Sequence, residues 1–147
     1  VKTLTNKEIC AALTSSSSSY ENYEISSASG TWTVNASRSK SNTFLQCRGK
    51  KGGYIKTPEF DKDIKSVTIH FTSEKPTYGD NVYCVFPSTW TAPTADKAYP
   101  DTGNVGKATT VKDVYSLTIP VEAGHKQVYI SIIGTYAYYL DHIDVAF

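Results

Sequence analysis

The sequence contains no methionine, only three cysteines, and no long uninterrupted apolar segment. A membrane-spanning helix needs roughly 18 or more consecutive apolar residues, so we expect no insertion into a membrane. Cys10, Cys47 and Cys84 form no C-x-x-C or Cys/His spacing that indicates zinc. A disulfide framework is not expected. Cys47 and Cys84 fall on the apolar alternation of predicted strands, with Leu45 in one strand and with Val82 and Phe86 in the other. We expect both to be small buried hydrophobic residues, and a single bridge between them is the alternative.

The sequence also lacks an excess of positive or negative residues. Charged residues make up 20% of the chain and the formal net charge is +1, so neither a basic nor an acidic surplus is present. Nucleic acid is usually bound through a basic surface that neutralises phosphates. We therefore expect no nucleic-acid partner.

Motifs of catalysis and nucleotide binding are absent. The sequence has no P-loop, no dinucleotide-binding glycine fingerprint, no G-x-S-x-G and no H-E-x-x-H. The three histidines, His70, His125 and His142, stand apart from any such motif. We predict that the chain is not an enzyme, and a hydrolase on a β-sandwich scaffold is the weakest of the hypotheses.

Tyrosine and alternating hydrophobic residues are abundant instead. Eleven residues are tyrosine, and after Tyr20 apolar residues recur at every second position, which is typical of strands with one buried face. Short strands without intervening helices predict a sandwich or a barrel. Uneven strand lengths and one long connection, residues 87–113, favour a jelly-roll sandwich. Residues 105–111 within that connection are a candidate for an extra edge strand. The predicted strands are residues 23–27, 31–37, 43–48, 53–57, 65–73, 81–86, 115–121, 126–133 and 138–147.

The first residues predict a short helix. Thr5 and Glu8 have the spacing of a capping box, and Ile9, Ala12 and Leu13 fall on one helical face. The serine run 15–19 follows as a connector. We therefore divide the chain into a helix and connector, residues 1–19, and an all-β sandwich of eight or nine antiparallel strands, residues 20–147.

The closing stretch, residues 139–147, contains an acidic residue in an apolar pattern. Asp141 is two positions before Ile143 and four before Val145, so the alternation predicts that its side chain points to the core. An unpaired buried carboxylate is too costly to persist. Asp141 must therefore accept backbone amides, pair with a lysine or arginine, or bind a metal ion.

Several segments resemble parts of jelly-roll, galactose-binding-like domains: residues 43–48, the glycine turn with residues 53–60, residues 64–69, and the closing residues 140–145. Such domains are accessory β-sandwich modules of secreted bacterial proteins, and many of them bind carbohydrate. The resemblance covers about residues 20–147. It implies an extracellular, cell-surface or periplasmic location, with the export signal outside this sequence.

The resemblance also implies a structural calcium ion. In such modules a carboxylate on the terminal strand, here Asp141, can hold calcium together with an acidic residue near the first strand, here Glu21 or Glu24. Calcium is bound by several carboxylate and carbonyl oxygens. The sequence has His142 where the resembled pattern often has a second acidic residue.

Sugar recognition requires flat aromatic faces and planar hydrogen-bonding groups. Trp90, Tyr99 and Tyr78 lie in predicted loops, where large aromatic side chains are costly to expose without use. Strand alternation predicts a second surface in which Gln46, Arg48 and His70 point outward. The alternatives are a loop anchor that folds back on the sandwich and an ordinary solvated face.

These observations favour a non-catalytic binding module for a polysaccharide or glycan. The alternative is a protein-interaction or spacer domain of a multidomain surface protein, in contact with other domains of its parent chain and without a small-molecule ligand. The start at Val1 and the serine-rich connector favour an origin as one piece of a longer protein.

Overall fold

A computed structural model describes residues 1–13, 20–40, 43–48, 53–72, 81–94, 102–134 and 137–147. These ranges contain one helix and eleven strands, in agreement with the predicted all-β class. The elements are β1 (Lys2–Leu4), α1 (Asn6–Ala12), β2 (Glu21–Ser27), β3 (Gly30–Lys40), β4 (Phe44–Cys47), β5 (Tyr54–Lys56), β6 (Ser66–Phe71), β7 (Val82–Pro87), β8 (Gly106–Thr109), β9 (Ser116–Pro120), β10 (Val128–Ile133) and β11 (Tyr138–Ala146).

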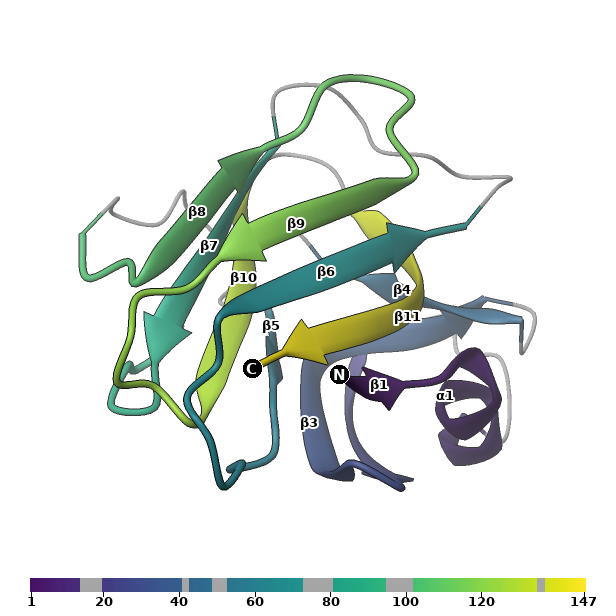
Figure 1. Cartoon of the computed structure of the whole chain (residues 1–147). Helices are drawn as coiled ribbons and strands as arrows, with labels where there is room; N and C mark the ends of the chain where they lie inside the picture. Colours follow the sequence, from purple (N-terminus) through teal and green to yellow (C-terminus); the bar gives the residue numbers. More distant parts are fainter. Residues whose placement is uncertain (14–19, 41–42, 49–52, 73–80, 95–101, 135–136) are drawn as a thin grey trace.

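The strands form one antiparallel hydrogen-bonded path that folds into two layers. Its order is β8-β7-β10-β5-β3-β4-β11-β6-β9, with β1 beside β11 and β2 beside β3. The middle of β3 pairs with β5 and its last residues pair with β4, so this long strand belongs to both layers. In Figure 1, β8, β7, β10 and β5 lie behind the layer of β9, β6 and β11. The chain is an all-β sandwich.

The core lies between these layers and follows the predicted alternation. Val67, Ile69 and Ile130 are fully buried, and so are Ile143 and Val145 of β11. Their polar neighbours in the sequence point to the outer faces, because successive side chains of a strand alternate. Trp32 of β3 is 0% exposed and belongs to this core.

The N-terminal residues belong to the same core. Thr5 caps α1 in the predicted capping box with Glu8. Leu4, Ile9 and Leu13 are buried in the main hydrophobic cluster, and β1 pairs with β11. The predicted domain boundary at residues 19 and 20 stays a prediction, since residues 14–19 lie outside the described ranges.

The described residues form eleven strands, two more than the nine predicted. β8 is the edge strand of the long connection after β7, and it pairs with β7. β1 has only three residues, too few to show an alternation in the sequence. Its pairing with β11 depends on a contact between the two ends of the chain.

The alternation of β7 is opposite to the predicted one. We expected Val82, Cys84 and Phe86 to face the core, but Tyr83 and Val85 are the β7 members of the core cluster. Phe86 is nevertheless only 1% exposed, because Trp90 stacks flat on it at 4.4 Å. A buried strand covered on both sides has no polar face that reveals its orientation.

Cys47 and Cys84 are both buried free thiols.

Glu8 connects the helix cap to the sandwich, which generates a prediction. Partial burial acts to raise the pKa of its carboxyl, but hydrogen bonds from the Thr5 hydroxyl and from the Thr5 and Ala28 amides lower it from 4.5 to about 2. A carboxyl with a lowered pKa contributes stability that is complete above 4.5 and is lost as the pH falls toward 2.

Glu8→Gln should therefore lower the free energy of unfolding by about 1 kcal/mol at neutral pH. The difference from wild type should shrink as the pH falls below 4.5. Urea unfolding at several pH values measures this difference in the free energy of unfolding, and Glu59→Gln, at an exposed position, is the matched control. A difference that is constant between pH 7 and pH 2 would contradict the role of the Glu8 charge.

Candidate functional site

The outer face of β6 and β11 carries a group of titratable side chains that we call the His–Asp cluster: His70, His142, Asp144 and Asp141. His70 lies directly opposite His142 in the pairing of β6 with β11, so both rings point to the same face. Asp144 is two residues further along β11 and shares that face. Thr3 of β1 lies opposite Asp144 from the other side.

Hydrogen bonds connect each histidine of the cluster to a carboxylate. His70 Nε2 lies 2.9 Å from Asp144 Oδ2, and His142 Nδ1 lies 2.7 Å from Asp141 Oδ2. Because an ionised carboxylate only accepts, these ring nitrogens are the donors. The Thr3 hydroxyl donates to Asp144 Oδ1 at 2.6 Å. The two imidazole rings stack with their centroids 3.9 Å apart.

The position of Asp141 corrects the prediction that its side chain faces the core. The register between β11 and β6 shifts between Leu140 and His142, so Asp141 is the extra residue of a β-bulge. Leu140 and Ile143 are both buried although they are three positions apart. The Asp141 side chain is 41% exposed and its partner is the adjacent His142.

Asp144 has the perturbed carboxyl of this cluster. Its partial burial acts to raise the pKa, but the hydrogen bonds from Thr3 and His70, together with the charges of His70 and His142, outweigh burial and lower it. The ionised form of Asp144 is thus the one that the fold stabilises.

The residues predicted to bind calcium do not gather around Asp141. Glu21 and Glu24 are exposed on β2, where Glu21 accepts a hydrogen bond from the Tyr23 hydroxyl at 3.4 Å. Within the described ranges, the three-residue group with metal-ligand spacing is His70, His142 and Asp144 instead. Calcium binding itself stays a prediction.

The cluster contains the His–carboxylate pairs from which many hydrolases are built, but among the described residues its hydrogen bonds join neither imidazole to a serine, threonine or cysteine side chain. In the part of the chain that the structure describes, the Thr3 hydroxyl donates to a carboxylate rather than to an imidazole. Cys10 Sγ lies 3.6 Å from the Asn6 amide oxygen, and burial together with the nearby Asp141 charge raises its pKa. A raised pKa keeps the thiol protonated and unreactive.

Gln46 and Arg48 form a separate contact with Tyr20. The Gln46 side chain points away from the core, as predicted, but it is 5% exposed and its amide donates to the Tyr20 hydroxyl at 3.1 Å. The Arg48 guanidinium lies over the Tyr20 ring, 5.1 Å from its centroid. Of the three predicted polar ligands, His70 therefore lies in the His–Asp cluster and the other two pack against Tyr20.

A second candidate surface lies on the other layer. We call it the aromatic face: Tyr54 of β5, Phe86 of β7, Tyr129 of β10, and Trp90. A hydrogen bond from the Trp90 amide to the Pro87 carbonyl turns the chain back over β7. The ring centroids of Tyr54 and Tyr129 lie 4.9 Å apart, and those of Trp90 and Tyr129 lie 5.3 Å apart. Predicted ligand residues Tyr78 and Tyr99 lie outside the described residues.

Strand register explains how the aromatic face is assembled. Thr33, Lys56, Tyr129 and Phe86 are successive partners across β3, β5, β10 and β7. Their side chains form one row, because directly paired residues point to the same side. The Lys56 ammonium lies 5.2 Å from the centroid of the Tyr129 ring.

Tyr54 and Tyr129 were not among the predicted ligand residues. Each precedes an isoleucine that is fully buried, Ile55 and Ile130, so the alternation already indicated that both tyrosines point outward. Nothing in the sequence indicated that they are neighbours, because β5 and β10 are far apart along the chain.

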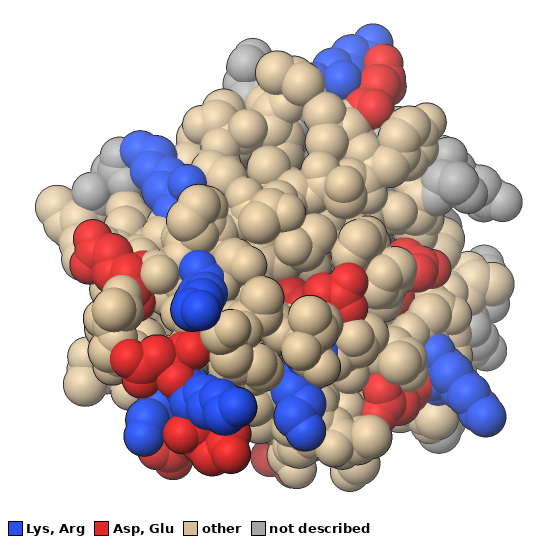
Figure 2. All heavy atoms as spheres, viewed as in Figure 1, with Lys and Arg blue, Asp and Glu red and all other residues tan. Residues whose placement is uncertain are grey.

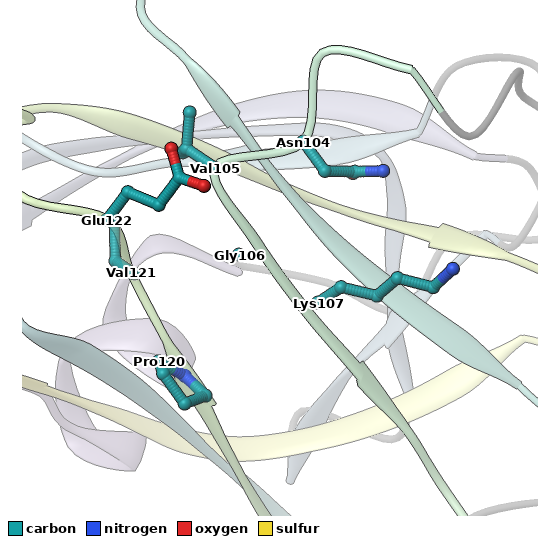
Figure 3. A pocket seen from close by; sticks show the side chains of 7 residues that line it. All are labelled: Asn104, Val105, Gly106, Lys107, Pro120, Val121 and Glu122. Atoms are coloured by element: carbon teal, nitrogen blue, oxygen red, sulfur yellow. The ribbon is translucent and has the colours of Figure 1, made fainter.

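A surface hollow lies between β8 and the end of β9, and seven residues line it: Asn104, Val105, Gly106, Lys107, Pro120, Val121 and Glu122. In Figure 3, Asn104 and Lys107 lie on one side of the hollow, and the Glu122 carboxylate lies beside Val105. Figure 2 shows charges of both signs interspersed along the lower edge of the β6–β9–β11 side.

Comparisons with known proteins found no matching family model, no matching curated protein and no matching solved structure. The two surfaces described above are therefore the features of this chain that bear on its function. The helical content of the described residues is α1 alone, and no helix there has the length and apolar character needed to cross a bilayer.

The hydrogen bond between Thr3 and Asp144 generates a prediction. Thr3→Val removes one of the interactions that lower the pKa of Asp144, so this pKa should rise toward 3.8. The stability that the ionised carboxylate contributes, which is lost as the pH falls below 3.8, should decrease. The side-chain carboxyl signal of Asp144 in a carbon NMR titration measures the change.

Thr118→Val is the matched control, because the Thr118 hydroxyl contacts Thr68 and not Asp144. An unchanged Asp144 titration in Thr3→Val would show that β1 does not influence the cluster.

Proposed function

We propose that this chain is a non-catalytic carbohydrate-binding module of the jelly-roll type, and that it binds its glycan on the aromatic face. The observation that carries the proposal is the cluster of Tyr54, Tyr129 and Trp90 on the outside of one sheet. The side chains of all three are only partly buried.

Aromatic side chains on an outer sheet face need an explanation, because apolar surface is ordinarily removed from water. Trp90 has a structural role in covering Phe86. Tyr54 and Tyr129 lie beside this contact and leave part of their rings to solvent. Rings of this kind offer a flat apolar surface to the C–H faces of a pyranose, while their hydroxyls stay available for hydrogen bonds.

The angles between the rings suggest the shape of the ligand. Tyr54 stands nearly perpendicular to Tyr129 and to Trp90, at 88° and 83°. A flat crystalline polysaccharide surface would require coplanar rings. A corner of perpendicular rings instead fits one sugar residue, at a chain end or at a bend of a soluble chain.

Polar side chains border the corner. Lys56 lies over Tyr129, and Asn35 is the direct cross-strand partner of Tyr54. Lys56 supplies donors for sugar hydroxyls, and its charge favours glycans that carry carboxylate or sulfate groups. A few oriented polar groups beside an aromatic surface are the usual composition of a small-ligand site.

Affinity electrophoresis against soluble plant, host and microbial polysaccharides, both neutral and acidic, tests the proposal. We expect one polysaccharide to retard the wild-type chain. Tyr54→Ala and Tyr129→Ala should each weaken this binding about two- to tenfold, because one aromatic contact contributes about 0.5–1.5 kcal/mol. Lys56→Gln should weaken binding mainly to acidic polysaccharides.

Tyr115→Ala is the matched control, since Tyr115 is a 50% exposed tyrosine outside the aromatic face. Trp90→Ala should reduce both binding and thermal stability, because it uncovers Phe86. Unfolding temperatures of all variants separate loss of binding from loss of fold. Retardation that persists in Tyr54→Ala and Tyr129→Ala would refute this location, and no retardation by any polysaccharide would favour the protein-interaction domain.

A further inference from the structure

We propose that His70, His142 and Asp144 form a binding site for a divalent transition-metal ion of the zinc type. This site lies on the layer of β6 and β11 and does not depend on the proposed glycan-binding function. The three residues each offer one ligand atom, and these atoms all lie within 4.8 Å of one another.

The ligand atoms reach the spacing of one ion only after the side chains rotate. Tetrahedral zinc binds imidazole nitrogen and carboxylate oxygen at about 2.0–2.2 Å, so two ligand atoms on one ion are roughly 3.4 Å apart. The strands place the three residues side by side, because His70 and His142 are cross-strand partners and Asp144 follows on β11. Side-chain rotation has to bring their ligand atoms closer together to hold one ion.

The imidazole of His142 has a carboxylate partner outside the proposed ligand set that orients it. Asp141 accepts from His142 Nδ1, which leaves Nε2 of that ring with a lone pair for the ion. A carboxylate behind the imidazole is the usual outer partner of a metal-binding histidine. The β-bulge is what places Asp141 beside His142 instead of in the core.

Asp144 is held in a similar way. Thr3 donates to its Oδ1, whereas Oδ2 faces His70 Nε2 at 2.9 Å. An ion bound by His70 Nε2 and Asp144 Oδ2 takes the place of the proton that these two atoms share. The Thr3 hydrogen bond can persist in that arrangement, since it uses the other oxygen.

Metal binding requires one ring to move. The two rings are stacked with an angle of 10° between their planes, and lone pairs lying in parallel planes do not converge on one point. The side chains of His70 and His142 are 29% and 33% exposed, which leaves room for one ring to rotate about χ2.

The donor set indicates the kind of ion. Two imidazoles and one carboxylate suit zinc, cobalt, nickel or copper, whereas calcium requires six to eight oxygen ligands. Three protein ligands leave at least one coordination position for water. A bound ion would cross-link β6 to β11 and stabilise the fold, because it binds the folded chain alone.

Calorimetric titration of the metal-free full chain with Zn²⁺ tests the site, with Co²⁺ absorption spectra as an independent readout. We expect one ion per chain, a raised unfolding temperature with Zn²⁺, and no such increase with Ca²⁺. His142→Gln and Asp144→Asn should each weaken Zn²⁺ binding by more than tenfold. His125→Gln is the matched control and should bind as wild type does, because His125 lies outside the cluster.

Asp141→Asn tests the positioning of His142. We expect a 10- to 100-fold weaker affinity, with an unchanged stoichiometry and an unchanged Co²⁺ spectrum, because the ligands themselves remain. Unfolding temperatures of the metal-free variants show whether each one is folded, and His70→Gln provides a second ligand variant on the other strand.

Two results would overturn the proposal. One is the absence of saturable Zn²⁺ binding up to about 1 mM. The other is Zn²⁺ binding that survives in His70→Gln, His142→Gln and Asp144→Asn but is lost in His125→Gln.

Discussion

The pairing of β11 with three other strands is the constraint on which the rest of the structure depends. β11 is hydrogen-bonded to β1, β4 and β6, so it joins the two ends of the chain and completes the front layer. Ile143 and Val145 carry its apolar side into the core. The opposite side presents His142 and Asp144, and the bulge at Asp141 adds a second carboxylate there.

The two candidate surfaces follow from this two-layer arrangement, and they differ in chemistry. The outer face of β6 and β11 gathers imidazoles and carboxylates that hydrogen-bond one another. The outer face of β5, β10 and β7 gathers aromatic rings around Trp90. Because the core separates the two outer faces, substitutions on one are expected to leave the other intact, and metal binding and glycan binding can be tested separately.

Much of the fold was predictable because strand alternation is a local signal. The strands around Ile69, Ile130 and Ile143 were predicted with the correct inward side, and the capping box at Thr5 was predicted from four residues. The prediction was wrong for β7, where Trp90 buries the outward Phe86, and for Asp141, where one extra residue changes the side. Local sequence does not reveal that a loop residue packs over a strand, and it does not reveal a β-bulge.

The sequence by itself determined the all-β class, the outward orientation of His70 and most of the core, because each depends on neighbours one to four positions away. The tertiary structure alone decided which side chains meet. His70 and His142 are far apart along the chain, and so are Tyr54 and Tyr129, yet each pair is in contact. Strand order and register create these contacts, and both are set by the packing of the whole sandwich.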